Sequence, residues 1–195
     1  MTTRRSTAIL ISGRGTNMAA LIEAARDPSY PAEIVLVISN IPTAKGLETA
    51  RAAGIKSLVI SHKEYSNKSM FEAALSHALN EAKIELICLA GFMRVLSADF
   101  VSRWTGRILN IHPSLLPAYR GLDTHKRVLA DGVKEHGCTV HFVVPELDAG
   151  PVIAQASVPI LEGDTVESLS ARVLIAENRL YPEALAKVAK TLASN

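Results

Sequence analysis

The chain has 195 residues, of which 48% are hydrophobic and 21% charged, and its formal net charge at pH 7 is +2. This composition is typical of a soluble globular protein and excludes a largely disordered chain, which would carry fewer apolar residues. The lysines and arginines are scattered along the sequence, so neither the net charge nor its distribution indicates a nucleic-acid partner.

Cysteine usage and the N-terminal stretch indicate an intracellular protein. Cys88 and Cys138 are far apart and form no CxxC pair, so we expect two reduced core thiols rather than a disulfide. The apolar residues 8–11 end at Ser12 and Gly13, which makes the stretch too short for a signal peptide, and no apolar run could span a membrane. We therefore expect an unprocessed cytoplasmic protein with no membrane partner, acting as a monomer or a homodimer.

Short apolar and β-branched runs alternate with helical patterns through the first half of the chain. The pattern predicts strands over residues 8–12, 34–39, 57–60 and 85–90, and helices over residues 17–26, 44–53 and 70–82. Gly54 is expected to end the second of these helices. This alternation predicts a parallel sheet that is covered by helices on both faces.

The pattern changes after Gly91. A strand over 107–111 is expected to run into a proline-rich loop, followed by a helix over 125–130 and by two strands with little between them, over 136–144 and 152–158. Two such strands favour antiparallel pairing. The spacing of Asp164 and Glu167 predicts a capping box for a last helix, and a frayed tail is expected over 192–195. The fold class is therefore α/β, an open, mostly parallel twisted sheet with antiparallel pairing in its C-terminal part.

Glycines in the segment 12–17 (SGRGTN), between the first strand and the first helix, let the backbone approach a ligand closely. The free N–H groups and the dipole at a helix start favour an anion such as phosphate; a tight turn without a ligand is the alternative. A dinucleotide site would have a third glycine in place of Met18 and an acidic residue in place of Ser39 or Asn40, and a Walker loop is absent. We therefore expect a sugar phosphate, and neither NAD nor a nucleoside triphosphate.

Asn110 and His112 flank Ile111 at the end of a predicted strand, so their side chains point to one side. Open α/β sheets bind ligands beyond the carboxyl ends of their strands. Asn offers a neutral donor and His a mobile proton, which suits a reaction that develops an oxyanion. Asp148 would favour the protonated imidazole if it lay near His112. The alternatives are a pair that braces a loop and a carboxylate that is only solvated.

His136, Cys138 and His141 are the residues that could suggest a metal site. In a strand, His136 and Cys138 share one face whereas His141 points to the other, so the three do not converge. We interpret them as core residues and expect no metal. His125 lies near the proline-rich loop and could approach the candidate site, but the pattern assigns it no role.

Four segments carry a family resemblance: ISGRGTN at 11–17, LAGFMRVL at 89–96, LNIHPSLLP at 109–117 and HGCTVHFV at 136–143. Together they resemble the folate-dependent formyltransferases, and among these the phosphoribosylglycinamide formyltransferases. The run NIHPSLLP is specific for the superfamily, and the loop 13–17 narrows the resemblance to this branch. The resemblance covers residues 8–182 and implies a Rossmann-like formyltransferase fold in a single domain, residues 1–195.

The resemblance also implies a reaction. Members of this branch transfer the formyl group of 10-formyltetrahydrofolate, a cosubstrate, to the glycine amine of 5-phosphoribosylglycinamide in purine (IMP) biosynthesis, without metal or NAD. Asn110, His112 and Asp148 match the catalytic trio of the family. The amine would attack the formyl carbon directly, Asn110 and protonated His112 would stabilise the oxyanion, and Asp148 would hold the His112 proton and assist proton transfer to the folate nitrogen.

The resemblance carries over binding positions as well. Those for the phosphoribosyl substrate are Gly15, Thr16, Asn17 and Glu177. Those for the folate are Lys68, Met93, Arg94, Val95, Leu96, Asn110, Val144, Pro145, Glu146, Leu147 and Asp148.

The sequence departs from the family pattern at three positions. Lys68 stands where many members have Arg, which keeps the charge but loses the planar fork. Asp123 and Asn178 each stand where many members have His. These departures affect accessory positions and leave the catalytic trio unchanged.

Three other functions are weighed against the transferase. A formyltetrahydrofolate hydrolase would carry an additional N-terminal domain, for which a first strand near residue 8 leaves no room. A methionyl-tRNA formyltransferase would carry a basic C-terminal domain. A noncatalytic module that binds folate or a sugar phosphate would not require a titrating group such as His112.

Overall fold

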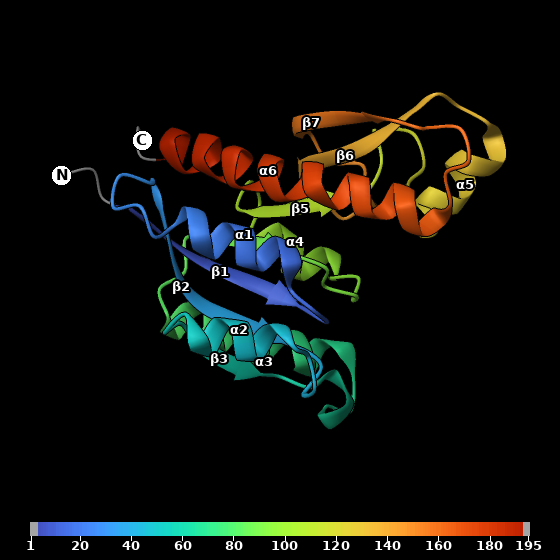
Figure 1. Cartoon of the computed structure of the whole chain (residues 1–195). Helices are drawn as coiled ribbons and strands as arrows, with labels where there is room; N and C mark the ends of the chain where they lie inside the picture. The colour runs from blue at the N-terminus through green and yellow to red at the C-terminus, as the bar shows by residue number, and fades with distance from the viewer. Residues whose placement is uncertain (1–3, 193–195) are drawn as a thin grey trace.

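A seven-stranded sheet forms the centre of the molecule (Figure 1). In the computed structural model, which describes residues 4–192, the strand order is β3-β2-β1-β4-β5-β6-β7. Neighbouring strands from β3 to β5 are parallel, whereas β6 pairs antiparallel with β5 and β7. This confirms the predicted fold class. The strands are β1 (Arg5–Ile11), β2 (Ala32–Ser39), β3 (Lys56–Val59), β4 (Leu86–Leu89), β5 (Ile108–His112), β6 (Glu135–Phe142) and β7 (Val152–Pro159).

Helices cover both faces of the sheet, as the alternating pattern predicted. One face packs against α1, α2 and α6, and the other packs against α3 and α4 (Figure 1). Gly54 adopts a left-handed φ of 74° just after α2 and ends that helix as expected. The helices are α1 (Thr16–Ala24), α2 (Gly46–Ala52), α3 (Lys68–Glu81), α4 (Ala98–Arg103), α5 (Thr124–Asp131) and α6 (Val166–Leu192), with a short 3₁₀ turn η1 (His62–Glu64).

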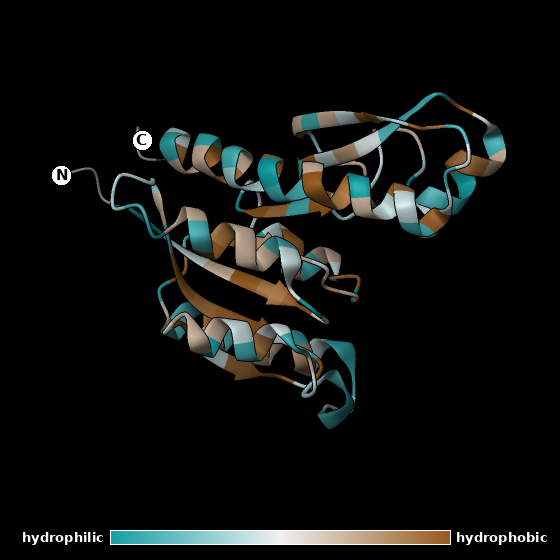
Figure 2. Cartoon of the chain, viewed as in Figure 1, coloured by the Kyte–Doolittle hydropathy of each residue, from teal (hydrophilic) through white to brown (hydrophobic). Residues whose placement is uncertain are grey.

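The inner strand β1 explains why the sheet has two cores. Ile9 and Ile11 point into the core beneath α1, α2 and α6, whereas Ala8 and Leu10 point into the core beneath α3 and α4. All four side chains are fully buried, so both faces of the strand must be apolar, and β1 and β2 are brown in Figure 2. Burying each Ile or Leu side chain contributes about 1.5–3 kcal/mol.

The long helix α6 crosses one face of the sheet and is tied to it near its middle. Its buried stripe includes Leu169, Val173 and Tyr181. The Tyr181 hydroxyl lies 3.0 Å from the carbonyl oxygens of both Leu89 and Leu109, on the neighbouring strands β4 and β5. This contact fixes the position of α6 over the strands that lead to the candidate site.

Two local expectations were incomplete or wrong. Helix α4 was not predicted; it begins at the N-cap Ser97, whose side chain accepts a hydrogen bond from Phe100 N. The predicted capping box of α6 is wrong, because Thr165 and Ser168 cap the helix reciprocally. Asp164 instead pairs with Arg172 at 2.6 Å.

The predicted frayed tail lies mostly outside the described residues, and Leu192 is still helical. Of the helices within residues 4–192, none has both the length and the apolar composition needed to cross a membrane.

Candidate active site

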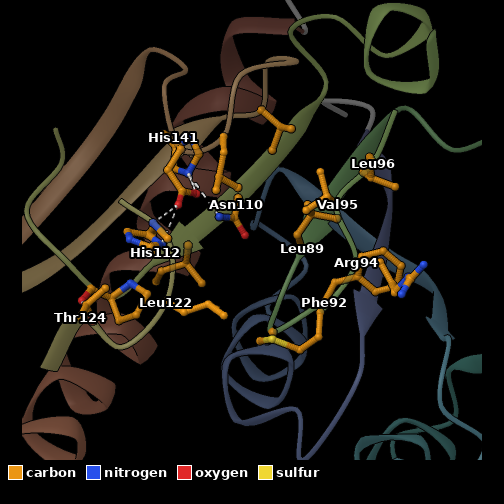
Figure 3. Close-up of a pocket in the computed structure, with 18 of the residues that line it drawn as sticks. Leu89, Phe92, Arg94, Val95, Leu96, Asn110, His112, Leu122, Thr124 and His141 are labelled. Atoms are coloured by element: carbon orange, nitrogen blue, oxygen red, sulfur yellow. Dashed lines mark hydrogen bonds and ion pairs between the residues drawn. The ribbon is translucent and has the colours of Figure 1, made fainter. Parts of the chain in front are cut away.

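A cavity of about 720 Å³ opens beyond the carboxyl ends of β4 and β5 (Figure 3). Four stretches line it: residues 91–96 after β4, residues 110–113 at the end of β5, residues 121–126 before and in α5, and residues 143–148 after β6. This is the position at which open α/β sheets bind ligands. The cavity is therefore the candidate active site.

His112, at the end of β5, is held between two oxygen acceptors. Its Nδ1 lies 3.4 Å from Asp148 Oδ2, and its Nε2 lies 2.9 Å from the carbonyl oxygen of Tyr119. The side chains of His112 and Asp148 are each only 8% exposed. Each ring nitrogen of His112 therefore faces an oxygen that can accept a hydrogen bond from an N–H group.

The loop between β6 and β7 delivers Asp148 to this position. Asp148 has a left-handed φ of 49°, and its Oδ2 accepts a hydrogen bond of 2.9 Å from Gly121 N. A Cβ at Gly150 would lie 1.7 Å from the Phe142 carbonyl oxygen, so only glycine allows the loop to pack this closely. The structure thus brings Asp148 to His112 from a distant part of the sequence.

Asn110 contacts His141, a residue that the sequence placed in the core. The two face each other in the antiparallel register of β5 and β6, and Asn110 Nδ2 lies 3.2 Å from His141 Nε2. His141 Nδ1 lies 2.9 Å from the Phe142 carbonyl oxygen, and Nε2 lies 3.8 Å from Asp148 Oδ1. Burial lowers the pKa of His141, which favours a neutral ring. Figure 3 shows Asn110, His112 and His141 grouped on one side of the cavity.

The turn before α1 presents backbone rather than side chains. Gly15 is the N-cap residue, with a left-handed φ of 72°, and within the described chain no side chain caps the helix. Gly46 N donates a hydrogen bond of 3.0 Å to Gly13 O, and a Cβ on Gly46 would lie 3.2 Å from Gly13 O and 3.3 Å from Arg14 O. The turn is thus held in place by close backbone packing, with the N–H groups of the helix start unpaired by side chains.

Asn17 and Glu177 meet beside this turn. Asn17 Nδ2 donates a hydrogen bond of 2.8 Å to Glu177 Oε2, and each residue is 8% exposed. Burial raises the pKa of the Glu177 carboxyl, and the hydrogen bond from Asn17 partly offsets this. Asn17 Oδ1 is buried and has no hydrogen-bond partner among residues 4–192. The predicted substrate positions are therefore together, with an acceptor available for a ligand donor.

Ser12 joins the turn to the cavity. Its Oγ accepts a hydrogen bond of 2.8 Å from Met93 N and donates one of 2.5 Å to Asn40 Oδ1. Within the described part of the chain, residues 13–17 and Glu177 are not among the residues that line the cavity. The turn and the cavity are thus neighbouring sites, joined by the hydrogen bond between Met93 N and Ser12.

Most predicted folate positions surround the mouth of the cavity. Met93 is 68% exposed, Val95 64% and Leu147 54%, and on the opposite wall Leu122, which the sequence did not single out, is 79% exposed. Figure 3 shows Leu122 facing Val95 and Phe92 across the opening. The other predicted folate positions in the lining are Arg94, Leu96, Asn110, Val144, Pro145, Glu146 and Asp148.

Lys68 is placed differently from the other predicted folate positions. It lies at the start of α3 and lines a second cavity of about 320 Å³, together with Glu72 and Arg103. It is not among the residues of the described chain that line the large cavity. The departure from the family pattern at this position thus coincides with a separate, more polar groove.

His125 and His136 form a pair at the edge of the cavity. His125 Nδ1 lies 3.0 Å from His136 Nε2, and the rings are 86° apart. Burial lowers the pKa of both residues, that of His136 to about 4. Because His136 pairs with His125 while His141 faces Asn110, these side chains do not converge on one point. Among residues 4–192, no three His, Cys, Asp or Glu side chains are grouped so as to hold a metal ion.

Known proteins resemble this chain in sequence and in fold. The formyl transferase family profile matches residues 5–185. The chain is 45% identical over 174 residues to phosphoribosylglycinamide formyltransferase of Escherichia coli (strain K12), covering 89% of this chain and 82% of that protein. A crystal structure of phosphoribosylglycinamide formyltransferase from Brucella melitensis has a TM-score of 0.93 and 54% identity, and the match covers 96% of each chain.

The chain also matches part of larger proteins. It is 54% identical over 188 residues to the trifunctional purine biosynthetic protein adenosine-3 of Gallus gallus, which covers 96% of this chain but 19% of that protein. The chain thus spans about a fifth of these trifunctional relatives, and most of the bacterial ones. It belongs to the formyl transferase family, among the phosphoribosylglycinamide formyltransferases.

Proposed function

We propose that this chain transfers the formyl group of 10-formyltetrahydrofolate to the glycine amine of 5-phosphoribosylglycinamide, a step of purine biosynthesis. The observation that carries the proposal is the group formed by Asn110, His112 and Asp148 at one end of a cavity of about 720 Å³. The chain would act on small molecules in the cytoplasm as one formyltransferase domain over 1–195, as a monomer or a homodimer.

The reaction forms one carbon–nitrogen bond and breaks another. The amine nitrogen attacks the formyl carbon, and the electron pair of the C=O bond moves to oxygen, which gives a tetrahedral oxyanion. When the oxyanion collapses, the bond to the folate N10 breaks, the amine nitrogen has lost a proton and N10 has gained one. The protein must therefore stabilise negative charge on oxygen and provide a path for one proton.

Asn110 and His112 are placed to stabilise the oxyanion. Asn110 has one amide N–H toward His141, which leaves the second for a ligand in the cavity. His112 Nε2 faces Tyr119 O, so it is not free to bond the oxyanion. In this orientation a protonated ring would stabilise the oxyanion through its positive charge alone. A direct hydrogen bond would require the ring to exchange Tyr119 O for the substrate oxygen. Removing one such donor costs on the order of 10²–10³ in rate.

Asp148 supports the protonated form of His112. Its Oδ2 lies 3.4 Å from His112 Nδ1 and also accepts from Gly121 N at 2.9 Å, so its orientation is fixed. A carboxylate beside the imidazole stabilises the cation when the oxyanion forms. The same carboxylate lines the cavity, where a water molecule between it and the substrates could carry the proton from the amine to N10.

The two substrates would occupy neighbouring sites. The phosphate group would bind at the backbone of Gly15, Thr16 and Asn17, at the positive end of the α1 dipole. Glu177, hydrogen bonded to Asn17, would accept hydrogen bonds from the rest of this substrate. The folate ring would lie between residues 93–96 and 144–148, where apolar side chains surround the cavity mouth and backbone groups line the wall.

The test measures absorbance as tetrahydrofolate is released, with and without phosphoribosylglycinamide. Turnover that requires this amine supports the proposal. Turnover with water alone would instead indicate a formyltetrahydrofolate hydrolase, and folate binding without turnover would indicate a noncatalytic module. Asn110→Ala is the variant that tests the oxyanion donor: turnover should fall on the order of 10²–10³.

A further inference from the structure

We propose that His141, as a neutral ring, is a positioning residue that fixes the amide of Asn110 in a single orientation toward the reacting carbonyl. The inference rests on the proposed function, because it assigns His141 a task in that reaction. It goes beyond the trio Asn110, His112 and Asp148 by adding a fourth side chain, from the strand that faces β5.

The antiparallel register places the two residues opposite each other. Asn110 on β5 pairs with His141 on β6, so their side chains leave the sheet at the same point and on the same face. Asn110 Nδ2 lies 3.2 Å from His141 Nε2, and His141 is 2% exposed. In Figure 3 the two side chains point toward each other, and the amide oxygen of Asn110 turns away from His141.

The Phe142 carbonyl oxygen determines which nitrogen of His141 carries the proton. It lies 2.9 Å from Nδ1 and can only accept, so Nδ1 must be the protonated nitrogen. Burial lowers the pKa of His141 and disfavours a second proton. Nε2 is then a bare lone pair, which can only accept a hydrogen bond.

A bare lone pair selects one of the two orientations of the Asn110 amide. With Nδ2 toward His141 the pair forms a hydrogen bond, whereas the flipped amide would place an oxygen lone pair against Nε2. The terminal torsion of Asn has broad, roughly two-fold preferences of its own, so a partner is needed to fix it. Fixed in this way, Asn110 always keeps an N–H available for the oxyanion.

Other groups around His141 do not replace this role. Asp148 Oδ1 lies 3.8 Å from Nε2, which is too long for a hydrogen bond and would form an ion pair only with a protonated ring. Burial is the largest effect on the pKa of His141 and lowers it overall. The Phe142 carbonyl and the Asp148 carboxylate raise this pKa, and the charge of His112 lowers it. The contact with Asn110 is therefore the one through which a neutral His141 acts on the site.

The first experiment compares His141→Leu and His141→Gln by steady-state kinetics. His141→Leu removes the acceptor, so we expect kcat to fall roughly tenfold, the factor that one net hydrogen bond contributes, with both KM values within twofold. In His141→Gln the side-chain oxygen can accept from Asn110, so kcat should recover by more than half of that loss on a logarithmic scale. Unchanged kcat in His141→Leu, or equal losses in both variants, overturns the proposal.

Val140→Ala is the matched control. Val140 is the fully buried neighbour of His141 on β6 and packs in the core beneath α6, so its truncation should lower stability while kcat and the KM values stay near those of the unmodified chain. If Val140→Ala lowers kcat as much as His141→Leu, the effect of His141 is general weakening of β6, and the proposal fails.

A double-mutant cycle shows whether His141 acts through Asn110. In an Asn110→Ala background nothing remains to be oriented, so adding His141→Leu should change the residual kcat by less than twofold. A further tenfold loss would show that His141 acts on Asp148 or His112 instead and would overturn the proposal.

A spectroscopic measurement keeps the inference testable without activity. The ¹⁵N signals of the His141 ring, assigned by comparison with His141→Gln, should show the neutral tautomer protonated at Nδ1 between pH 6 and pH 8. A ring protonated at Nε2, or at both nitrogens, overturns the proposal even if the chain is an active formyltransferase. Absence of transferase activity with the Nδ1 tautomer present would contradict the proposed reaction but leave the positioning geometry intact.

Discussion

The parallel and antiparallel parts of the sheet contribute to the candidate site in different ways. On the parallel side, the turn between β1 and α1 offers backbone N–H groups, and it is held by the close approach of Gly46. On the antiparallel side, β5 and β6 bring Asn110 and His141 together, and the next loop adds Asp148. The parallel side can thus bind an anion with backbone N–H groups. On the antiparallel side, the groups that can stabilise a charge formed during the reaction are side chains, and the register of the strands brings them together.

The largest expected effect lies on the antiparallel side, at Asp148. Asp148→Asn removes the negative charge that faces His112 Nδ1 at 3.4 Å while keeping the shape of the side chain. An amide in place of a carboxylate that orients an imidazole costs up to about 10⁴ in rate in other enzymes, and we expect kcat to fall on the order of 10³. Steady-state kinetics measures the loss, and far-ultraviolet circular dichroism checks the fold.

Glu162→Gln is the control for this variant. Glu162 is an exposed carboxylate in the turn between β7 and α6, so its neutralisation should leave kcat within twofold of the starting value. If kcat in Asp148→Asn falls no more than in Glu162→Gln, Asp148 has no part in catalysis. The antiparallel side would then not supply the catalytic carboxylate.

The parallel side should respond through KM rather than kcat. In Gly46→Ala the new Cβ would lie 2.6 Å from Ile11 Cδ1, an atom at the end of a side chain that can move. It would also lie 3.2 Å from Gly13 O and 3.3 Å from Arg14 O, so the backbone of the turn before α1 must give by a few tenths of an ångström. We expect KM for phosphoribosylglycinamide to rise roughly tenfold, because the backbone donors for its phosphate are displaced, while KM for the folate changes little. Titration of each substrate at saturating concentration of the other measures both values.

Gly54→Ala serves as the comparison for Gly46→Ala. Gly54 follows the same helix, α2, and has a left-handed φ of 74° but open space around its Cα. The alanine should lower stability by about 1 kcal/mol through backbone strain and leave both KM values unchanged. An equal rise in KM in the two variants would mean that instability of α2, and not displacement of the turn, produces the effect.

The two halves of the site also differ in how well the sequence predicts them. β1 is buried on both faces, so it appears as a continuous apolar run, and the glycines after it indicate a close turn without any knowledge of the fold. The pairing of Asn110 with His141 requires the register of β5 and β6, which no local pattern carries. Local alternation assigned His141 correctly to the face opposite Cys138, but it did not show that this face borders the cavity.

Two smaller errors have local causes. Helix α4 has six residues, too few for a helical period to stand out, and only its N-cap Ser97 could have indicated it. For α6, the spacing of Asp164 and Glu167 suggested a capping box, but Arg172 binds the Asp164 carboxylate at 2.6 Å. With Asp164 engaged by Arg172, the helix is capped by Thr165 and Ser168.

The histidine pair of the antiparallel side predicts a pH-dependent stability. Burial lowers the pKa of His136 from 6.5 to about 4, so the unfolded chain binds this proton first as the pH falls. The stability is fully present above pH 6.5 and is lost as the pH falls from 6.5 to about 4. Because His125 opens to the cavity, solvent screening reduces the effect to roughly 1 kcal/mol.

Urea denaturation at pH 7.0, 5.5 and 4.5 measures this loss, and His136→Leu is the variant that isolates it. The variant should lose less stability than the unmodified chain over the same interval, because its side chain binds no proton. Asp164, whose pKa is lowered chiefly by its hydrogen bond to Arg172, weakens the fold only at more acidic pH, below its ordinary value of 3.8. Parallel curves for the two proteins would remove His136 as the cause.

The smallest expected effect concerns Ser12, where the two halves of the site meet. Ser12→Ala leaves Met93 N and Asn40 Oδ1 without the hydroxyl that joins them. Met93 is exposed, so water can replace the lost contact on that side, and only the alignment of residues 93–96 with the turn is weakened. We expect KM for the folate to rise about threefold with kcat nearly unchanged. Ser29→Ala is the control: it removes an exposed hydroxyl that bonds Asp27, and it should change neither value. If Ser12→Ala instead raises KM for the phosphoribosyl substrate alone, the hydroxyl serves the turn and not the folate wall, and the two halves are coupled elsewhere.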